Sequence, residues 1–386
     1  MAQPPTDHEA DLPTLRPVRS ADAEAVWGLL APSTDELIGM SSLPHSLEAA
    51  VETCRASGAT LADLATGSFA VAEGQARRLL FVIELTGGGD GSAARAVGLT
   101  GVTIKHRFPN LAVEVATSED GLGLVMASSS APWTRTELDS SFLAPEARGR
   151  GLGTLMSRGR FPFLHLVGSQ IPLTVVAHLR GRFDDDGSAP FWRCFGANIA
   201  SWPTSTDAER ALTRQPDLLD DLAGHRRPLT GEVLDSLGPV NAASLPAFHL
   251  LQSEGLVPNG MYDPIDGGPT LVADLDDTVS GRRRVHGRAR IRPVDPPGAA
   301  GTTGARRTDA LVSVAGIDRF RVTRVPVELG DRTVGITRDA ADALRVDDDA
   351  LLTAVPLAGA EATASGPSGD PSGTSNDRDA TEAGSA

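Results

Sequence analysis

The sequence has a single lysine, only two cysteines and no long apolar run. Lys105 is the one lysine among 35 lysine and arginine residues, which indicates a bias in composition. Cys54 and Cys194 are too few for a disulfide framework, and neither has CxxC or Cys/His metal-ligand spacing. No apolar run reaches the roughly 20 residues of a transmembrane helix, and the first residues lack the pattern of a secretory signal. We therefore expect a cytoplasmic protein with two buried thiols, no bound metal and no membrane partner.

The sequence also has no excess of basic over acidic residues. The 386 residues include 50 acidic and 35 basic ones, which gives a formal net charge of -15. Nucleic acids and anionic membranes are bound by clustered positive charge, so neither is an expected partner. The remaining composition, 40% hydrophobic and 22% charged, is that of an ordinary globular protein. Its length allows two or three domains.

The strongest functional signal is a glycine-rich turn between a strand and a helix. It reads Arg148-Gly149-Arg150-Gly151-Leu152-Gly153. Such a turn offers backbone N–H groups and the positive end of a helix to a phosphate group. The sequence of this turn does not match the dinucleotide-binding fingerprint, Gly-x-Gly-x-x-Gly followed by an acidic residue, and it does not match a P-loop, which ends in Gly-Lys-Ser/Thr. Arg-x-x-Gly-x-Gly instead resembles the acyl-CoA pyrophosphate turn of the GNAT N-acyltransferase superfamily; the alternative is a loop that only caps a surface helix.

The chain before the turn predicts two helices followed by strands. A strand near Leu15–Val18 leads into a helix with Ser20 as its N-cap, and a second helix covers residues 46–56. Runs rich in valine, leucine and isoleucine then predict an antiparallel meander and one further strand before the central one. These runs are residues 69–72, 79–85, 97–105, 112–116 and 122–127.

The chain after the turn predicts alternating helices and strands. The helix that starts at Gly151 should kink or end near Pro162, because proline lacks the N–H donor of a helix interior. A buried strand at 173–179 and a short helix at 187–196 follow. Further helices are expected at 218–223, 230–237 and 241–256, and strands at 271–275, 285–291, 311–314 and 320–327.

Composition and pattern divide the chain into five regions. Residues 1–13 and 358–386 are polar and without periodicity, so we expect disordered tails there. Residues 14–200 carry the expected acyl-CoA-binding domain, and residues 201–285 a second half that repeats its closing helix. Residues 286–357 are expected to form a small β-rich region.

Taken together, the motifs resemble those of one family, the arginine N-succinyltransferases. They occur in the family's order between about residues 15 and 275, and the most specific are Ser188-x-Pro-Phe-Trp192 and Asp266-Gly-Gly-Pro-Thr-Leu271. The others are Ser41-Ser-Leu-Pro44, Glu137-Leu with Leu143-x-Pro145, Leu155-Met-Ser-Arg158 with Arg160-Phe161, Arg180-Gly181, Gly196 and Glu254-Gly255.

The resemblance implies an α+β protein with tandem GNAT-like acyltransferase halves and a mixed, mostly antiparallel sheet. It also implies succinyl-CoA as the donor co-substrate, no further cofactor, L-arginine or ornithine as the acceptor, and a homo- or hetero-oligomer. Acyl-CoA would bind the central strand at Ser141 and Leu143, mainly through the backbone, and the turn from Arg148 to Gly153. The acceptor α-amine must be neutral to attack the thioester, and the leaving thiolate needs a proton or a donor.

The expected acceptor side departs from the family. The histidine taken as the family's proton donor is replaced by Asn241, and asparagine cannot transfer a proton near neutral pH. His178 stands where the family has an acidic residue, two positions before the Arg-Gly pair, and is the best substitute. Other candidates are His225, His249 and Tyr262. Two functions stay open: an N-acyltransferase that acts on arginine or another amine, and a catalytically weak CoA-binding subunit that supports an active partner.

Overall fold

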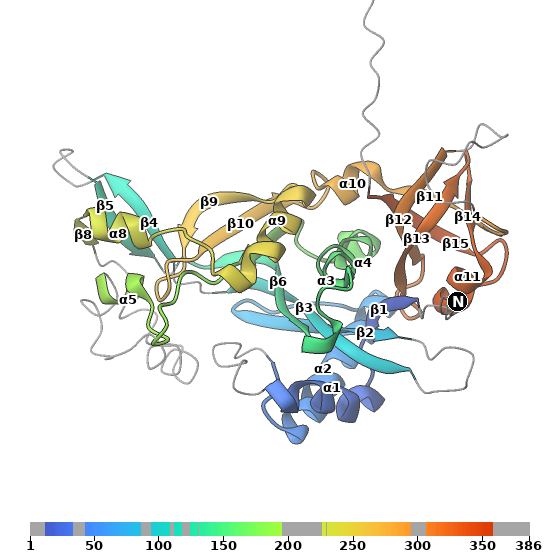
Figure 1. The fold of residues 1–386 in the computed structure, drawn as a ribbon, viewed down its shortest axis with the longest axis horizontal. Helices are drawn as coiled ribbons and strands as arrows, with labels where there is room; N and C mark the ends of the chain where they lie inside the picture. The colour runs from blue at the N-terminus through green and yellow to red at the C-terminus, as the bar shows by residue number, and fades with distance from the viewer. Residues whose placement is uncertain are drawn as a thin grey trace, which may run out of the picture.

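One mixed β-sheet runs through the described part of the chain and carries helices on both faces (Figure 1). The computed structural model describes residues 12–33, 43–85, 94–108, 112–117, 124–129, 131–194, 226–228, 230–294 and 306–357. Most neighbouring strands are antiparallel, so the expected α+β class with a mixed sheet is confirmed. The expectations for residues 1–11, Ser41-Ser42, Gly196, 218–223, His225 and 358–386 lie outside the described residues.

The first layer consists of three strands and two helices that cover one of their faces. Its elements are β1 Pro13–Pro17, α1 Ala23–Leu30, α2 Leu47–Thr66, β2 Gln75–Leu85 and β3 Arg95–Phe108. Ser46 caps α2, because its hydroxyl accepts the N–H of Ala49 at 3.0 Å. Gly67 ends this helix in the left-handed conformation, at φ 73°. The second helix therefore continues well beyond the expected residue 56.

Two expectations for this layer are wrong. Ser20 does not cap α1, because it lies in a 3-10 turn, Ser20–Asp22, and the Asp22 carboxylate accepts the N–H of Arg19 at 2.6 Å. Residues 69–72 form no strand, because α2 leaves only a short connection before β2. The apolar residues of that connection, Phe69 and Val71, pack against the core instead.

Three short strands form an arm at the far end of the sheet (Figure 1). They are β4 Ala112–Thr117, β5 Leu124–Ser129 and β8 Arg226–Pro228. β4 pairs with β5 and with β9, Val257–Tyr262, whereas β3 pairs with β6, Trp133–Leu143. The expected single meander is therefore wrong: the chain leaves the central sheet after β3, builds the arm and returns with β6.

The glycine-rich turn leads into two short helices, α3 Leu152–Arg158 and α4 Arg160–Val167. The expected break lies at Gly159, three residues before Pro162. A proline ring disturbs the helical turn that precedes it. In addition, proline has no N–H to donate to the carbonyl four residues back. Pro162 itself lies in the first turn of α4, where backbone N–H groups have no partner within a helix.

The second part of the chain continues the same sheet. β7, Thr174–His178, is parallel to β6, and β10, Pro269–Asp274, joins β7 to β9. The helices here are α5 Pro190–Cys194, α8 Gly231–Ser236, α9 Leu245–Glu254 and α10 Val279–Arg283. The described part of residues 201–285 has no sheet of its own, so the expected tandem halves are not supported.

Two apolar cores lie on opposite faces of the sheet. One packs α3 and α4 against it, and Phe81, Phe163 and Phe320 meet there edge to face. The other lies under α1 and α2 and contains Cys54. Burial raises the pKa of the Cys54 thiol to about 11. Cys54 is thus the expected buried thiol, whereas Cys194 is only partly buried.

The C-terminal strands close into a five-stranded barrel (Figure 1). Its strands are β11 Val285–Ile291, β12 Arg306–Val314, β13 Val322–Leu329, β14 Thr333–Ile336 and β15 Leu351–Pro356. The pairing order β13, β12, β15, β11, β14 returns to β13. α11, Arg338–Leu344, packs against the apolar core of the barrel. The sequence predicts strands here but not their closure.

β1 joins the barrel to the rest of the sheet. Leu15 pairs with Ile83 of β2 on one side and with Val322 of β13 on the other. Beside this junction, the Glu84 carboxylate binds Arg16 at 2.8 Å and Arg321 at 2.6 Å. Burial alone would raise the pKa of Glu84, but the two guanidinium groups hold it below its ordinary value. The junction is therefore held by strand pairing of the backbone and by the buried Glu84 carboxylate with its two arginine partners.

Candidate functional site

The parallel strands β6 and β7 diverge at the centre of the sheet. They pair only at Thr136 with Val175 and at Glu137 with Val176. β7 ends at His178, whereas β6 continues to Leu143. Among the described strands, none pairs with this edge of β6 beyond Glu137. The central strand therefore has one edge that no described strand covers, directly before the glycine-rich turn.

A β-bulge interrupts β6 in the same segment. Gly101 of β3 faces Asp139 and Leu99 faces Phe142, so Ser140 and Ser141 share one position. Ser140 has a positive φ of 57°. The extra residue reverses the alternation of side chains, and Phe142 packs under α1 and α2. The Ser141 hydroxyl lies 3.2 Å from that of Thr100, and this contact occupies it within the sheet.

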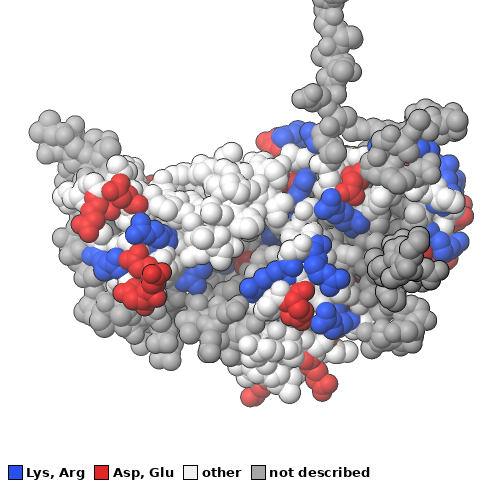
Figure 2. Space-filling view, in the orientation of Figure 1, with Lys and Arg blue, Asp and Glu red and all other residues white. Residues whose placement is uncertain are grey.

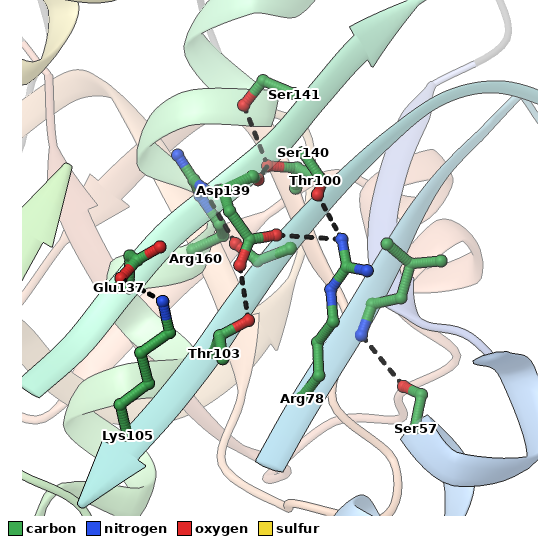
Figure 3. A network of polar contacts seen from close by, with 12 residues as sticks. Ser57, Arg78, Thr100, Thr103, Lys105, Glu137, Asp139, Ser140, Ser141 and Arg160 are labelled. Atoms are coloured by element: carbon green, nitrogen blue, oxygen red, sulfur yellow. Dashed lines mark hydrogen bonds and ion pairs between the residues drawn. The ribbon is translucent and has the colours of Figure 1, made fainter. Parts of the chain in front are cut away.

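Charged side chains hold this bulge in place. Arg78 donates to the Asp139 carboxylate at 3.0 Å and also to the Ser140 hydroxyl, while Thr103 donates to Asp139 at 2.5 Å (Figure 3). The buried Arg160 reaches the carbonyls of Gly101 at 3.0 Å and Asp139 at 3.4 Å. Burial lowers the pKa of Arg160 to about 10, and Asp139 opposes part of that effect. The shape of the central strand is thus fixed from both faces.

The glycine-rich turn has an open backbone. Gly149 and Gly151 have φ values of 75° and 76°, and no other atom lies within 4 Å of where a Cβ would be. Gly151 precedes the first residue of α3, Leu152, which is buried. Arg148 and Arg150 are exposed, and Figure 2 shows basic side chains gathered in this region of the surface. A phosphate group could approach these N–H groups without meeting a side chain.

The helix after the turn is tied to α9. A Cβ on Gly153 would lie 3.7 Å from Leu250, so the two helices pack closely at this glycine. Further along, Arg158 binds Glu254 at 2.6 Å, with side chains that are 8% and 0% exposed. The second oxygen of Glu254 accepts the N–H of Ser280 at 2.5 Å. This buried pair fixes the turn relative to the helix that follows Asn241.

Three loops converge where β7 ends. The N–H of Asn241 donates to the carbonyl of Arg180 at 2.8 Å, and the N–H of Gly238 donates to Gly267 at 2.8 Å. The Asn241 side-chain oxygen accepts the N–H of Ala243 at 2.9 Å, so this residue caps the turn before α9. The structure therefore brings Asn241 next to the end of β7.

His178 also lies at this end of β7, but both ring nitrogens contact the protein. Nδ1 is 3.0 Å from the Thr270 hydroxyl, and Nε2 is 3.6 Å from Glu137. His178 Nε2 has no accessible surface, although the side chain as a whole is 29% exposed. A proton transfer to a substrate would therefore require the ring to rotate. His249 is exposed on α9, and Tyr262 lies in β9.

Glu137 is the residue of this site whose environment sequence reasoning missed. It accepts from Lys105 at 2.8 Å and from Arg135 at 3.1 Å. Burial would raise the pKa of Glu137, but the contact with His178 and the charges of Lys105 and Arg135 hold it well below its ordinary value. The family motif includes Glu137, and Arg135 precedes it on β6, but Lys105 and His178 come from β3 and β7 and could only be found from strand pairing.

Asp266 is a buried carboxyl group in the converging loops. It accepts the N–H of Gly268 at 2.8 Å and lies 3.9 Å from Arg180. Burial and the nearby Asp263 raise its pKa from 3.8 to about 8. A Cβ on Gly181 or Gly268 would lie 2.0 Å from a backbone oxygen, which explains why this packed junction has glycine at both positions.

Asp266 should make the stability of the folded protein fall with rising pH. Between pH 3.8 and about 8 the folded state retains a proton that the unfolded chain has released, so unfolding becomes easier as pH rises. We expect Asp266→Asn to reduce this slope, measured as the urea midpoint at pH 5, 6, 7 and 8. An identical slope in the folded Asp266→Asn protein would show that Asp266 is ionised throughout.

The described residues include no group of three or more His, Cys, Asp or Glu side chains placed to hold a metal ion. Within the same residues, the helices are too short or too polar to span a lipid bilayer. The parts of the candidate site described above are the free edge of β6, the open turn and the charged groups around Glu137 and Asp139.

Comparisons with known proteins agree with the motifs. A family model described as arginine N-succinyltransferase beta subunit matches residues 13–280, and a model of its C-terminal domain matches residues 290–356. An arginine N-succinyltransferase of Photorhabdus laumondii is 26% identical over 356 residues, 89% of this chain and 97% of that protein. One of Escherichia coli is 29% identical over 233 residues, 59% of this chain and 65% of that protein.

Among solved structures, the arginine/ornithine succinyltransferase subunit AI of Pseudomonas aeruginosa is similar in fold. The match covers 90% of this chain and 100% of that one, with a TM-score of 0.71. The sequence identity is 21%, so this likeness concerns the arrangement of the elements.

Proposed function

Since the chain belongs to the family of arginine N-succinyltransferase beta subunits, we propose that it transfers the succinyl group of succinyl-CoA to the α-amine of L-arginine. The product is N2-succinylarginine, and the reaction belongs to arginine catabolism. The observation that carries this proposal is the open turn at Gly149 and Gly151 directly after a strand edge with which no described strand pairs. An extended pantetheine arm needs such an edge, and a pyrophosphate needs such a turn.

The donor would lie along β6. Its pyrophosphate would meet the N–H groups of the turn Arg148, Gly149, Arg150, Gly151, Leu152 and Gly153. The pantetheine arm would follow the backbone at Ser141 and Leu143, and the thioester would lie near the point where β6 and β7 separate. Leu143 is partly buried against the core and accepts from Arg148 at 3.2 Å, so strand and turn are joined. No further cofactor is part of this proposal.

The acceptor amine would attack the thioester carbonyl from the side of Asn241 and His178. Attack requires the neutral amine, and collapse of the tetrahedral intermediate releases CoA as a thiolate that must gain a proton. Holding amine and thioester together supplies much of the acceleration. Asn241 can donate a hydrogen bond to a developing charge but no proton, and His178 would need to turn its ring away from Glu137.

A second function is favoured by one observation. The Asn241 oxygen caps the turn before α9, so this residue has a structural role that requires no catalysis. A chain that binds CoA but lacks a proton donor would support an active partner in a hetero-oligomer. The two functions are separated by thiol release from succinyl-CoA or acetyl-CoA with arginine, ornithine and other amines. Release by the isolated chain supports the enzyme, and its absence with intact CoA binding supports the subunit.

We further propose the working context of the protein. An enzyme that consumes succinyl-CoA is expected in the cytoplasm, where this co-substrate occurs, and as a homo- or hetero-oligomer. For the domains, we propose an acyl-CoA-binding region from residue 14 and a β-rich region at residues 286–357. Limited proteolysis between the two regions, followed by CoA binding to each fragment, tests this division.

The turn can be tested at Gly151. Gly151→Ala should lower CoA affinity by well over tenfold, because the added Cβ would lie where the pyrophosphate must approach. A factor of ten in affinity corresponds to about 1.4 kcal/mol of binding free energy. Calorimetry with CoA measures this. Gly67→Ala is a matched control, because Gly67 has a φ of 73° and equally open surroundings but ends α2. Equal CoA affinity in folded Gly151→Ala and Gly67→Ala proteins would remove the turn from the site.

A further inference from the structure

The nitrogen atoms of three side chains converge on one oxygen of Glu137. Lys105 Nζ is 2.8 Å from Oε2, Arg135 Nε is 3.1 Å and His178 Nε2 is 3.6 Å. Glu137 and Lys105 lie on neighbouring strands and point toward each other (Figure 3). One carboxylate oxygen is therefore the meeting point of side chains from β3, β6 and β7.

Lys105 and Arg135 share the single carboxylate of Glu137. Asp139, two residues further along β6, is held by Arg78 and Thr103. The Lys105 side chain is only 18% exposed, so its ammonium group lies in a largely buried position. A ligand carboxylate that accepts from this ammonium group would make a charge-assisted hydrogen bond there.

Lys105 is the group best placed to meet such a ligand. Arg135 is occupied at its second end by the carbonyls of Trp133 at 3.3 Å and Phe108 at 3.5 Å. The ammonium group of Lys105 has three donors and gives one to Glu137, while its charge also lies 5.1 Å from the centre of the Phe108 ring. Lys105 is also the single lysine of the chain, at a position where a compact charge fits.

The cluster lies where an acyl group would end. Glu137 is the last residue of β6 that pairs with β7. A donor that runs from the turn back along β6 past Ser141 brings its thioester to this point. A succinyl group continues beyond the thioester and ends in a carboxylate, which an acetyl group lacks. We propose that Lys105, supported by Arg135 and His178, binds a substrate carboxylate, by position that of the succinyl group; the donor assignment rests on the proposed function.

The decisive variant is Lys105→Met, which keeps the length of the side chain and removes its charge. Calorimetry compares succinyl-CoA with acetyl-CoA as ligands. Wild type should bind succinyl-CoA about 10- to 100-fold more tightly, the effect of one charge-assisted hydrogen bond, and Lys105→Met should lose this preference. Arg107→Met is the matched control, because it removes a cation from the same strand and breaks an exposed ion pair with Glu73 at 2.8 Å. It should keep the preference.

The acceptor can also supply a carboxylate, so a second arm compares arginine with agmatine, which lacks it. A Lys105→Met effect on the arginine-to-agmatine ratio of kcat/KM, with the donor preference unchanged, assigns the carboxylate to the acceptor. Unchanged ratios in both arms in a folded variant overturn the proposal. If Lys105→Met does not fold, Lys105→Gln takes its place in both arms. If wild type releases no thiol with any amine, the proposed function fails, and the donor calorimetry still decides on Lys105.

Discussion

Asn241→His is expected to raise kcat with succinyl-CoA and arginine by roughly 10²- to 10⁴-fold, the contribution typical of a positioned general acid or base. The backbone of residue 241 is fixed by its bond to Arg180 and by the turn before α9. The side chain of a histidine at this position would therefore extend from a backbone that lies beside the end of β7, next to the proposed thioester. The change also removes the cap on Ala243, at a cost of about 1 kcal/mol.

The measurement is thiol release by purified wild type, Asn241→His, His178→Ala and the double variant. If His178 already transfers the proton, Asn241→His should change little, and His178→Ala should abolish turnover with CoA binding intact. If the chain is a supporting subunit, neither variant creates activity in the isolated protein. Turnover that is equal in all four proteins would show that neither residue takes part in proton transfer.

Glu254→Ala is expected to lower the free energy of unfolding by about 3–5 kcal/mol, since it leaves the Arg158 charge buried without a partner. The same change frees the N–H of Ser280. Urea unfolding at neutral pH measures the loss. Glu52→Ala is the control, because its partner Arg55 and Glu52 itself are more than 60% exposed, and no change is expected.

The double variant Arg158→Met with Glu254→Met separates charge from packing. Replacing both partners by apolar side chains of similar length removes the unpaired charge, so it should be more stable than Glu254→Ala. A double variant that is as unstable as the single one would mean that α3 and α9 are held by the shape of these side chains. Under either result, CoA binding by the variants reports whether the turn keeps its geometry.

Local signals in the sequence allowed part of this structure to be predicted. The turn from Arg148 to Gly153 was recognisable because glycine recurs at every second position, and Ser46 is a capping residue in front of an apolar run. Proline chemistry predicted the break that occurs at Gly159. Each of these features depends on residues within one or two turns of the chain. The family motifs added the central strand and the position of Asn241.

The features that were missed depend on strand pairing. Lys105 and Glu137 are 32 residues apart, and only the register between β3 and β6 brings them together. The bulge at Ser140 was not predictable, because serine rarely adopts a positive φ and is held in it here by Arg78. Runs of valine and leucine indicated strands in the last region, but they do not encode that β12 pairs with both neighbours and closes a barrel.

The pairing of β1 with β13 sets a delay during synthesis of the chain. Leu15 emerges from the ribosome first, and its partner Val322 follows about 300 residues later, about 15 to 60 s at typical rates of translation. During that time β1 can pair with β2 on one side only, and its other edge and the carboxylate of Glu84 wait for β13 and Arg321. An unpaired edge attracts other strands, so a nascent chain stalled before β13 is the form most exposed to aggregation. The pairing of β13 with β1 therefore covers a strand edge that stays exposed during synthesis of the chain.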